Sequence, residues 1–215
     1  MKKLSQINEN IFDGIGKRSK GGVVRKENYV DQVDLGLPSG TIWAAWNLGA
    51  SSPEECGDYY AWGETEPKDN YFWGTYKFGV QDNLTKYNEK DGKTILDPED
   101  DAAHVALGGK WHIPTNDQLQ ELLDNTTNEE SELNGIKGRL FTSKTNGNTL
   151  FFPYSGYKSG SKVYIIYSCQ YWSSSIDKTS YNHAMRVYSD TDSSTLACSY
   201  RNVGHFVRGV LDKFR

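Results

Sequence analysis

The alternation of hydrophobic and polar positions predicts a buried strand near the start of the organised part of the chain. Thr41-Ile-Trp-Ala-Ala-Trp-Asn follows the turn sequence Leu37-Pro-Ser-Gly, and such β-branched and aromatic runs are typical of strands. Ser52-Pro-Glu-Glu combines a capping hydroxyl, a proline and two acids, which predicts the start of a short helix. Residues 64–95 are polar with scattered aromatics, so we expect a long loop that packs through its aromatic side chains.

Two helices are expected before residue 125. In Asp97-Pro-Glu-Asp-Asp-Ala-Ala-His, Asp97 is the expected cap, and the acids after it would be stabilised by the helix dipole. Thr115-Asn-Asp-Gln is a capping box, and Leu119, Leu122 and Leu123 form one apolar stripe behind it.

The remainder of the chain predicts strands. Arg139-Leu-Phe-Thr-Ser-Lys and Thr149-Leu-Phe-Phe-Pro flank Asn146-Gly, a strong hairpin signal. After Gly160 come short Tyr/Ser/Val segments without helical periodicity, which predict a meander of strands and exposed loops. The order of strand, helices and strands places the chain in the α+β class.

The first 32 residues differ from the rest. Ile7, Ile11, Phe12 and Ile15 have helix-like spacing and precede a basic, glycine-rich break. This segment is either a terminal helix packed on the domain or a docking segment that holds the domain on a larger particle. The organised domain is expected over residues 33–215. The N-terminus has no apolar signal-peptide core, so we expect synthesis in the cytoplasm without a signal peptide.

Composition and charge exclude several classes. The 24 Lys+Arg against 28 Asp+Glu argue against nucleic-acid binding through a basic field, and the chain has no apolar run long enough for membrane insertion. The 6 Trp, 14 Tyr, 8 Phe and 21 Gly argue against disorder and against a helical bundle. The three cysteines are widely spaced and include no CxxC pair, so they predict neither a zinc site nor a disulfide framework.

Catalytic chemistry has no motif in this sequence. It lacks HxxxH, HExxH, GxSxG and the phosphate-binding GxxxxGK[ST] pattern, so we expect a protein that is not an enzyme and has no cofactor. Asp97, Glu99, Asp100 and Asp101 could offer oxygen ligands to calcium. Helix capping explains the same acids without an ion, and we therefore predict no metal site.

The most informative segment is residues 167–206, where Tyr, Trp, His and Arg stand among Ser, Thr, Asn and Asp. Aromatic anchors beside short polar groups are typical of recognition surfaces. A half-buried sheet would have the same composition, because Tyr is also a good strand former.

Six ordered motifs across residues 33–210 carry a family resemblance. They are Asp34-Leu-Gly-Leu-Pro-Ser-Gly-Thr-Ile-Trp-Ala with Asn47-Leu-Gly-Ala, Gly57-Asp-Tyr-Tyr-Ala-Trp-Gly, Leu96-Asp-Pro-Glu-Asp-Asp-Ala-Ala, Trp111-His-Ile-Pro-Thr, Thr142-Ser-Lys-Thr-Asn-Gly-Asn, and Tyr171-Trp-Ser-Ser-Ser with Val207-Arg. The chain resembles the major paralogous domain family of gut bacteria and their phages. That family is similar to the C-type lectin-like fold, in the branch shared with formylglycine-generating enzymes. The resemblance implies two helices, a small antiparallel sheet and long irregular loops.

Some members of this branch are variable (target) proteins of diversity-generating retroelements, whose C-terminal segment is rewritten by adenine-directed mutagenesis. The resemblance thus implies a variable region over residues 167–206 that contacts a ligand. Residues 176–206 contain only Lys178 and Met185 from the residue types that such mutagenesis of Asn codons cannot produce. The sequence departs from the family at Val207-Arg-Gly-Val, where Val-Arg-Pro-Val is usual, and in its Leu-Asp-Lys-Phe-Arg tail. It also lacks the Glu-Pro-Asn and Gln-Pro-Asp tripeptides of calcium-dependent sugar binding.

The resemblance divides the variable region into exposed and buried positions. The expected exposed contact residues are Asp177, Thr179, Ser180, Tyr181, Asn182, His183, Arg186, Tyr188, Tyr200, Asn202, Val203 and His205. The expected scaffold residues are Trp172, Ser173, Ala184, Arg201, Gly204, Val207 and Arg208.

Three functions remain open from the sequence. The leading hypothesis is a non-catalytic binding protein, displayed on a phage particle or cell surface, that recognises a protein or glycan ligand on a cell. The second is a structural component of a phage particle or cell surface. The third is a formylglycine-generating-type oxidase, in which Cys169 and Cys198 would have to hold copper between two thiolates.

Overall fold

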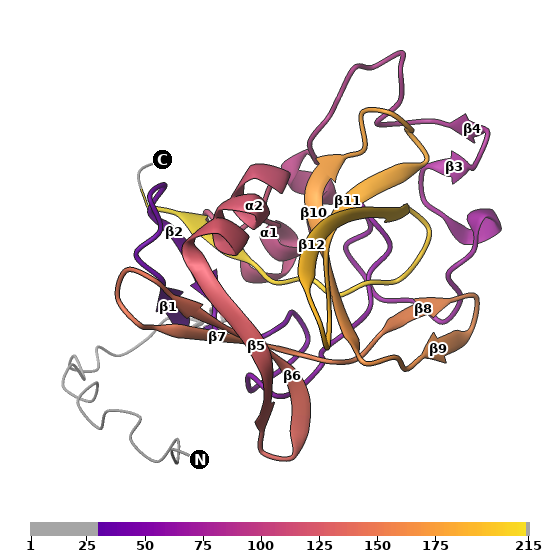
Figure 1. Ribbon diagram of the computed structural model, residues 1–215. Helices are drawn as coiled ribbons and strands as arrows, with labels where there is room; N and C mark the ends of the chain where they lie inside the picture. The colour runs from indigo at the N-terminus through magenta and orange to yellow at the C-terminus, as the bar shows by residue number, and fades with distance from the viewer. Residues whose placement is uncertain (1–29, 214–215) are drawn as a thin grey trace, which may run out of the picture.

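The computed structural model describes residues 30–213, and the regular structure of this part of the chain consists mainly of small antiparallel sheets (Figure 1). The structure is 40% strand and 12% helix, with five sheets and two α-helices, of which one is longer than six residues. The α+β class and the single small sheet expected from the sequence are therefore wrong: the fold is mostly β. The structure has more strands than we expected, because short polar segments pair with neighbouring segments although their own sequences only weakly favour strands.

The two ends of the described chain meet in one sheet. Strand β2 (Thr41–Ala44) lies between β1 (Gln32–Asp34) and β13 (Val210–Asp212), and Trp43 is paired on both sides. All four residues of β2 are buried, which confirms the predicted buried strand. The docking segment predicted over residues 1–32 lies outside the described residues except for its last three.

Two α-helices are found in the region before residue 125, as expected, but the predicted cap of the first is wrong and the helix predicted at Ser52 is absent. Residues 98–100 form a short 3₁₀ helix, η2 (Pro98–Asp100), and α1 (Ala102–Leu107) follows it. Asp97 makes no side-chain cap there, because α1 starts later and Asp101 accepts the hydrogen bond from the His104 amide. The helix predicted at Ser52 is a turn instead, since the Glu55 carboxylate binds the Ser51 amide and hydroxyl.

Helix α2 (Asn116–Asn125) begins with the predicted capping box. The Thr115 hydroxyl accepts from the Gln118 amide at 3.2 Å, and the Gln118 side chain accepts from the Thr115 amide at 2.9 Å. Leu119 and Leu122 are buried beneath it. The local pattern is sufficient here because both partners of the box lie within one turn.

Replacing Thr115 by alanine is expected to lower the free energy of unfolding by about 1 kcal/mol, because an N-terminal amide of α2 loses its acceptor. Urea denaturation monitored by circular dichroism would measure the change. Thr127→Ala, at an exposed position of the next strand, is the control and should change stability by less than about 0.5 kcal/mol. Equal effects of the two substitutions would contradict the capping role.

A second sheet follows α2. Strands β5 (Thr126–Leu133), β6 (Ile136–Ser143) and β7 (Thr149–Pro153) pair in that order, and the β6–β7 pair confirms the predicted hairpin. Strand β5 was not predicted, because its residues are mostly polar and carry no strand signal. Figure 1 shows the β5–β6 hairpin projecting away from the helices.

The C-terminal meander forms a sheet whose strands and connections carry the predicted contact residues. Strands β10 (Ser168–Ile176), β11 (His183–Asp190) and β12 (Ser194–Tyr200) are antiparallel neighbours. Two hairpins lie near it, β3 (Gly79–Val80) with β4 (Asn83–Leu84) and β8 (Tyr157–Ser159) with β9 (Lys162–Tyr164). The 3₁₀ helix η1 (Trp73–Thr75) precedes β3 in the long polar segment.

Two buried arginines connect this sheet to the rest of the core. Arg201 donates to the Tyr76 hydroxyl and to the carbonyls of Lys86, Tyr87 and Tyr181. Arg208 donates to the Asn47 side chain and to three carbonyls on other segments, those of residues 44, 45 and 151. Because each guanidinium is satisfied by groups far apart in sequence, the two side chains fix the loops around the C-terminal sheet.

Candidate functional site

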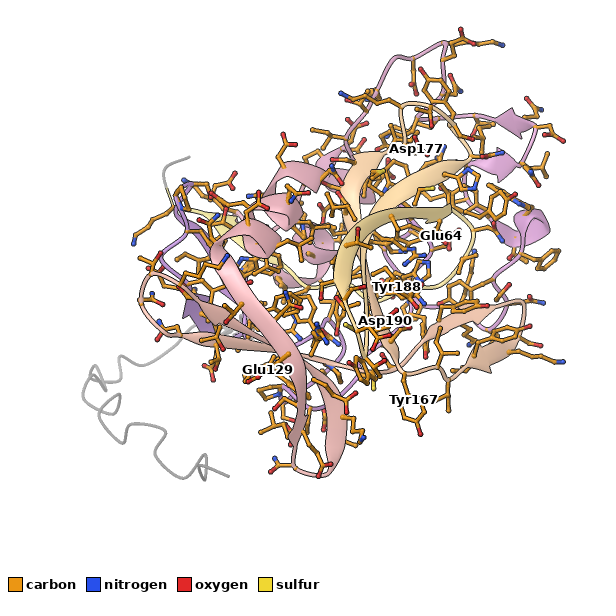
Figure 2. All side chains as sticks on the ribbon, in the orientation of Figure 1. Glu64, Glu129, Tyr167, Asp177, Tyr188 and Asp190 are labelled. Atoms are coloured by element: carbon orange, nitrogen blue, oxygen red, sulfur yellow. The ribbon has the colours of Figure 1, made fainter. Side chains whose placement is uncertain are left out.

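The predicted contact residues lie along β11, at the end of β12 and in the connections around these strands. Figure 2 shows Asp177 at one end of the sheet and Tyr188 and Asp190 toward the other. Ten of the twelve predicted positions are accessible to solvent. The exposed or half-buried ones are Asp177, Thr179, Ser180, Tyr181, Asn182, His183, Arg186, Tyr188, Tyr200 and Val203.

Asn202 and His205 are not exposed, which corrects their predicted positions. After β12 the chain turns back under the sheet, where the Tyr60 amide donates to the His205 carbonyl at 2.9 Å. The His205 ring packs edge-on against Trp172, and its Nε2 lies 2.8 Å from the Ser199 hydroxyl. Asn202 is buried and donates to the Tyr71 carbonyl. The return of the chain is a long-range contact that composition does not reveal.

The expected scaffold residues are all buried. Trp172, Ser173, Ala184, Arg201, Gly204, Val207 and Arg208 lie inside the protein. At position 204 only glycine fits, because a Cβ there would lie 2.9 Å from the Tyr71 ring and 3.0 Å from the Tyr59 Cβ. Accessible and buried positions thus separate within one short segment of the chain.

The connection between β10 and β11 forms one wall of a polar cavity. Ser180, Tyr181 and Asn182 line a hollow of about 330 Å³ together with residues 81–84 and 88–90. The Ser180 hydroxyl donates to the Asn182 side chain at 2.7 Å, and Arg201 holds the Tyr181 carbonyl. The side chains at the cavity are therefore presented by a fixed backbone.

An aromatic pair lies beside this connection. The rings of His183 and Tyr200 stack with centroids 4.2 Å apart, and Trp73 of η1 contacts Tyr200 edge-on. Burial lowers the pKa of His183, against an opposing effect of the Asp177 charge. The ring is consequently neutral at pH 7 and offers a flat surface rather than a charge.

Arg186 and Tyr188 lie on the other face of the same sheet. Side chains alternate along a strand, so residues 186 and 188 share the face opposite to residues 183, 185 and 187. The Arg186 guanidinium lies 5.1 Å from the centroid of the Tyr188 ring. The predicted contact residues therefore form two surfaces, one at each face of the sheet.

An exposed apolar segment that was not predicted from the sequence lies next to the second surface. Val163, Tyr164, Ile165, Ile166 and Tyr167 are all exposed, and Ile165 keeps 85% of its surface. Figure 2 shows Tyr167 below the end of the sheet that carries Tyr188. The available signal was the run of five apolar residues without an alternating polar position, a pattern that predicts a fully buried strand.

The acidic cluster considered for calcium contains a lysine at its centre. Carboxylate oxygens of Asp97, Glu99 and Asp100 lie within 4.8 Å of one another. The Lys86 ammonium lies 2.7, 3.2 and 2.5 Å from them, and Asp101 points elsewhere, to the amide of Ile113. A side-chain cation thus already occupies the position that a metal ion would take.

The two cysteines of the oxidase hypothesis do not form a pair. Cys169 on β10 lies opposite Ser189 of β11, whereas Cys198 on β12 lies opposite Met185. With β11 between them, their strands are about 10 Å apart, too far for two thiolates to share one copper ion. Burial also raises the pKa of the Cys169 thiol to about 12, which opposes thiolate formation.

Comparisons of this chain with protein-family models, with curated proteins and with solved structures found no match. The structure itself shows a mostly β protein. Its C-terminal sheet carries accessible side chains, and buried arginines support the backbone around it. Within the described residues, no helix is long and apolar enough to cross a membrane.

Proposed function

We propose that this chain is a non-catalytic ligand-binding protein that recognises a protein or glycan ligand on a cell surface. Its C-terminal sheet is the recognition surface, and retroelement mutagenesis diversifies the accessible side chains of this sheet. The proposal follows the family resemblance of the motifs in residues 33–210. It includes display on a phage particle, with residues 1–32 as the docking segment.

One observation carries this proposal. Between residues 172 and 208, accessible stretches such as residues 177–183 are interrupted by buried positions, and buried Arg201 and Arg208 hold the backbone through contacts outside the segment. Substitutions at the accessible positions would change the surface without altering the core. Tyr supplies contact area at a low entropy cost, and short polar side chains supply adaptable hydrogen bonds.

Sequencing the codons for residues 165–210 in many isolates tests the diversification. We expect substitutions at the ten accessible positions, few at the seven scaffold positions, and a template repeat with a reverse transcriptase gene nearby. Invariant codons at Tyr181, His183 and Tyr200, without such a template, would refute diversification and leave a conventional binding protein.

Replacing both half-buried Tyr181 and exposed Tyr200 by alanine is expected to weaken binding of the full chain to its target cells at least tenfold, because aromatic anchors dominate recognition surfaces. Flow cytometry with labelled protein would measure the binding, and thermal unfolding would verify that the variant is folded. Ile136→Ala, at an exposed apolar position on the β5–β6 hairpin, is the matched control. Unchanged cell binding with loss of particle assembly would favour the structural-component function.

A further inference from the structure

Arg186 differs from the other arginines that the structure describes. Arg139, Arg201 and Arg208 each donate at least four hydrogen bonds to side chains or carbonyls. In Arg186 the Nε and Nη1 atoms are inaccessible to solvent and have no hydrogen-bond partner. Its guanidinium is therefore the one among these four whose donors the protein does not satisfy.

The surroundings of Arg186 do not supply a compensating charge. Trp172 and Ala197 lie opposite it on the neighbouring strands, and Tyr157 and Tyr188 are its nearby titratable phenols. Among the described residues, no carboxylate forms an ion pair with it. A half-buried, unpaired cation is unfavourable, and such groups are common where a ligand completes the pairing.

His205 is adjacent and also incompletely paired. It is 1% exposed, its Nδ1 has no hydrogen-bond partner, and its ring centroid lies 6.1 Å from that of Tyr157. Burial lowers the pKa of His205 far below its usual value, and the Arg186 charge lowers it further. The ring is neutral, so the positive charge at this site is that of Arg186.

An apolar surface is continuous with this cation. Tyr157 stacks on Tyr164 of β9 with ring centroids 5.0 Å apart, which connects the Arg186 site to the exposed segment 163–167. At the other end, Ser168 pairs with Asp190, so Tyr167 lies at the end of the strand that carries Tyr188. Exposed apolar runs of this length mark interaction sites on soluble proteins.

We propose that the face formed by Arg186, Tyr157, Tyr188 and residues 163–167 binds an acidic segment of a protein partner. A carboxylate of that segment pairs with the Arg186 guanidinium at Nη2, which is not among the solvent-inaccessible atoms, and flanking apolar side chains pack against Ile165 and Tyr167. The uncompensated cation selects a carboxylate, and the apolar run favours a protein over a glycan. This inference rests on the proposed binding function and names its ligand class.

The test uses two capped peptides, acetyl-Ile-Glu-Ile-amide and acetyl-Ile-Gln-Ile-amide, which differ in one carboxylate. Each is titrated into the full chain at constant ionic strength while NMR follows the Arg186 Nε–H resonance, assigned by its loss in Arg186→Gln. We expect the Glu peptide to shift this resonance and to bind at least tenfold more tightly than the Gln peptide. In Arg186→Gln, which lacks this resonance, binding is followed through the backbone amides of residues 163–167, and the difference between the two peptides should disappear. Lys137→Gln, which removes an exposed lysine of the β5–β6 hairpin, should preserve it.

Two further variants test the contribution of the apolar segment 163–167. Ile165→Ser and Tyr167→Ala are expected to weaken both peptides by a similar factor, because neither change affects the cation. Preference of the site for N-acetylneuraminic acid over the Glu peptide would overturn the assignment to a protein. A concentration-dependent dimer that Ile165→Ser abolishes would instead identify this face as a contact between copies of the chain.

These outcomes are separable from failure of the proposed function. If neither peptide shifts the Arg186 resonance while the full chain still binds cells through Tyr181 and Tyr200, the acidic-segment inference is wrong and the binding function stands. If the Glu peptide binds but the double alanine variant still binds cells normally, the inference stands and the predicted recognition surface is wrong.

Discussion

Replacing Arg208 by methionine is expected to lower the free energy of unfolding by about 3–5 kcal/mol. The guanidinium is completely buried and donates to the Asn47 side chain and to the carbonyls of Ala44, Ala45 and Phe151. Methionine fills much of the volume but donates no hydrogen bond, so these acceptors would remain buried and unpaired. Denaturation in urea, followed by tryptophan fluorescence, would measure the loss.

Arg186→Met is the matched control, because the same two residue types are exchanged. The Nε and Nη1 donors of Arg186 have no partner, so their removal leaves no acceptor unpaired. We expect a change below about 1 kcal/mol, or a small gain in stability. Losses of equal size in the two variants would show that the hydrogen bonds of Arg208 do not account for its contribution to stability.

Lys86→Met is expected to destabilise the protein by about 2 kcal/mol at pH 7, since the buried carboxylate of Asp100 would lose a partner. Lys86 contacts three carboxylates, and the side chain of Asp100 among them is only 4% exposed. The ion pair of Lys137 with Glu130 lies on the exposed β5–β6 hairpin. Its removal in Lys137→Met should change the free energy of unfolding by less than about 0.5 kcal/mol.

The effect of Lys86 depends on pH with a defined sign. Burial alone would raise the pKa of Asp100, but hydrogen bonds from Lys77, Lys86 and Tyr87 hold it below its usual value. Hydrogen bonds from Lys86 and Lys93 likewise lower the pKa of Asp97. A carboxylate with a lowered pKa stabilises the fold above its unfolded value of about 3.9, and this contribution is lost as the pH falls through the folded value.

Stability curves of the native protein and of Lys86→Met should therefore converge below about pH 4. Urea midpoints between pH 3 and 7 would measure this convergence. A constant difference over that range would show that Lys86 acts through packing on the Tyr87 ring, 4.9 Å from its ammonium, rather than through the carboxylates.

Sequence patterns predicted those parts of the fold that are determined locally. The capping box of Thr115, the hairpin of β6 and β7 and the buried strand β2 are confirmed. Each depends on contacts within a few residues or on a continuous apolar run. The prediction of a helix at Ser52 is wrong because the Glu55 carboxylate accepts a hydrogen bond from the Ser51 amide and closes a turn.

Long-range contacts explain most of the remaining errors. His205 is polar and follows an exposed strand, yet it is buried because the chain pairs there with Tyr60. The acids at residues 97–100 resemble a helix cap, yet they surround Lys86 from another segment. The exposure of residues 163–167 could not be predicted either. An apolar run is expected to be buried, and the sequence does not show that no other element covers this one.

The hydrogen bond from Arg201 to residue 181 has a consequence for molecular evolution. The acceptor in this bond is the main-chain carbonyl of Tyr181 and not its side chain, and every amino acid supplies that carbonyl. Codon changes at position 181 can therefore replace the side chain while the anchor of the loop stays the same. Heritable variation of this side chain can accumulate without loss of the hydrogen bond that anchors the loop.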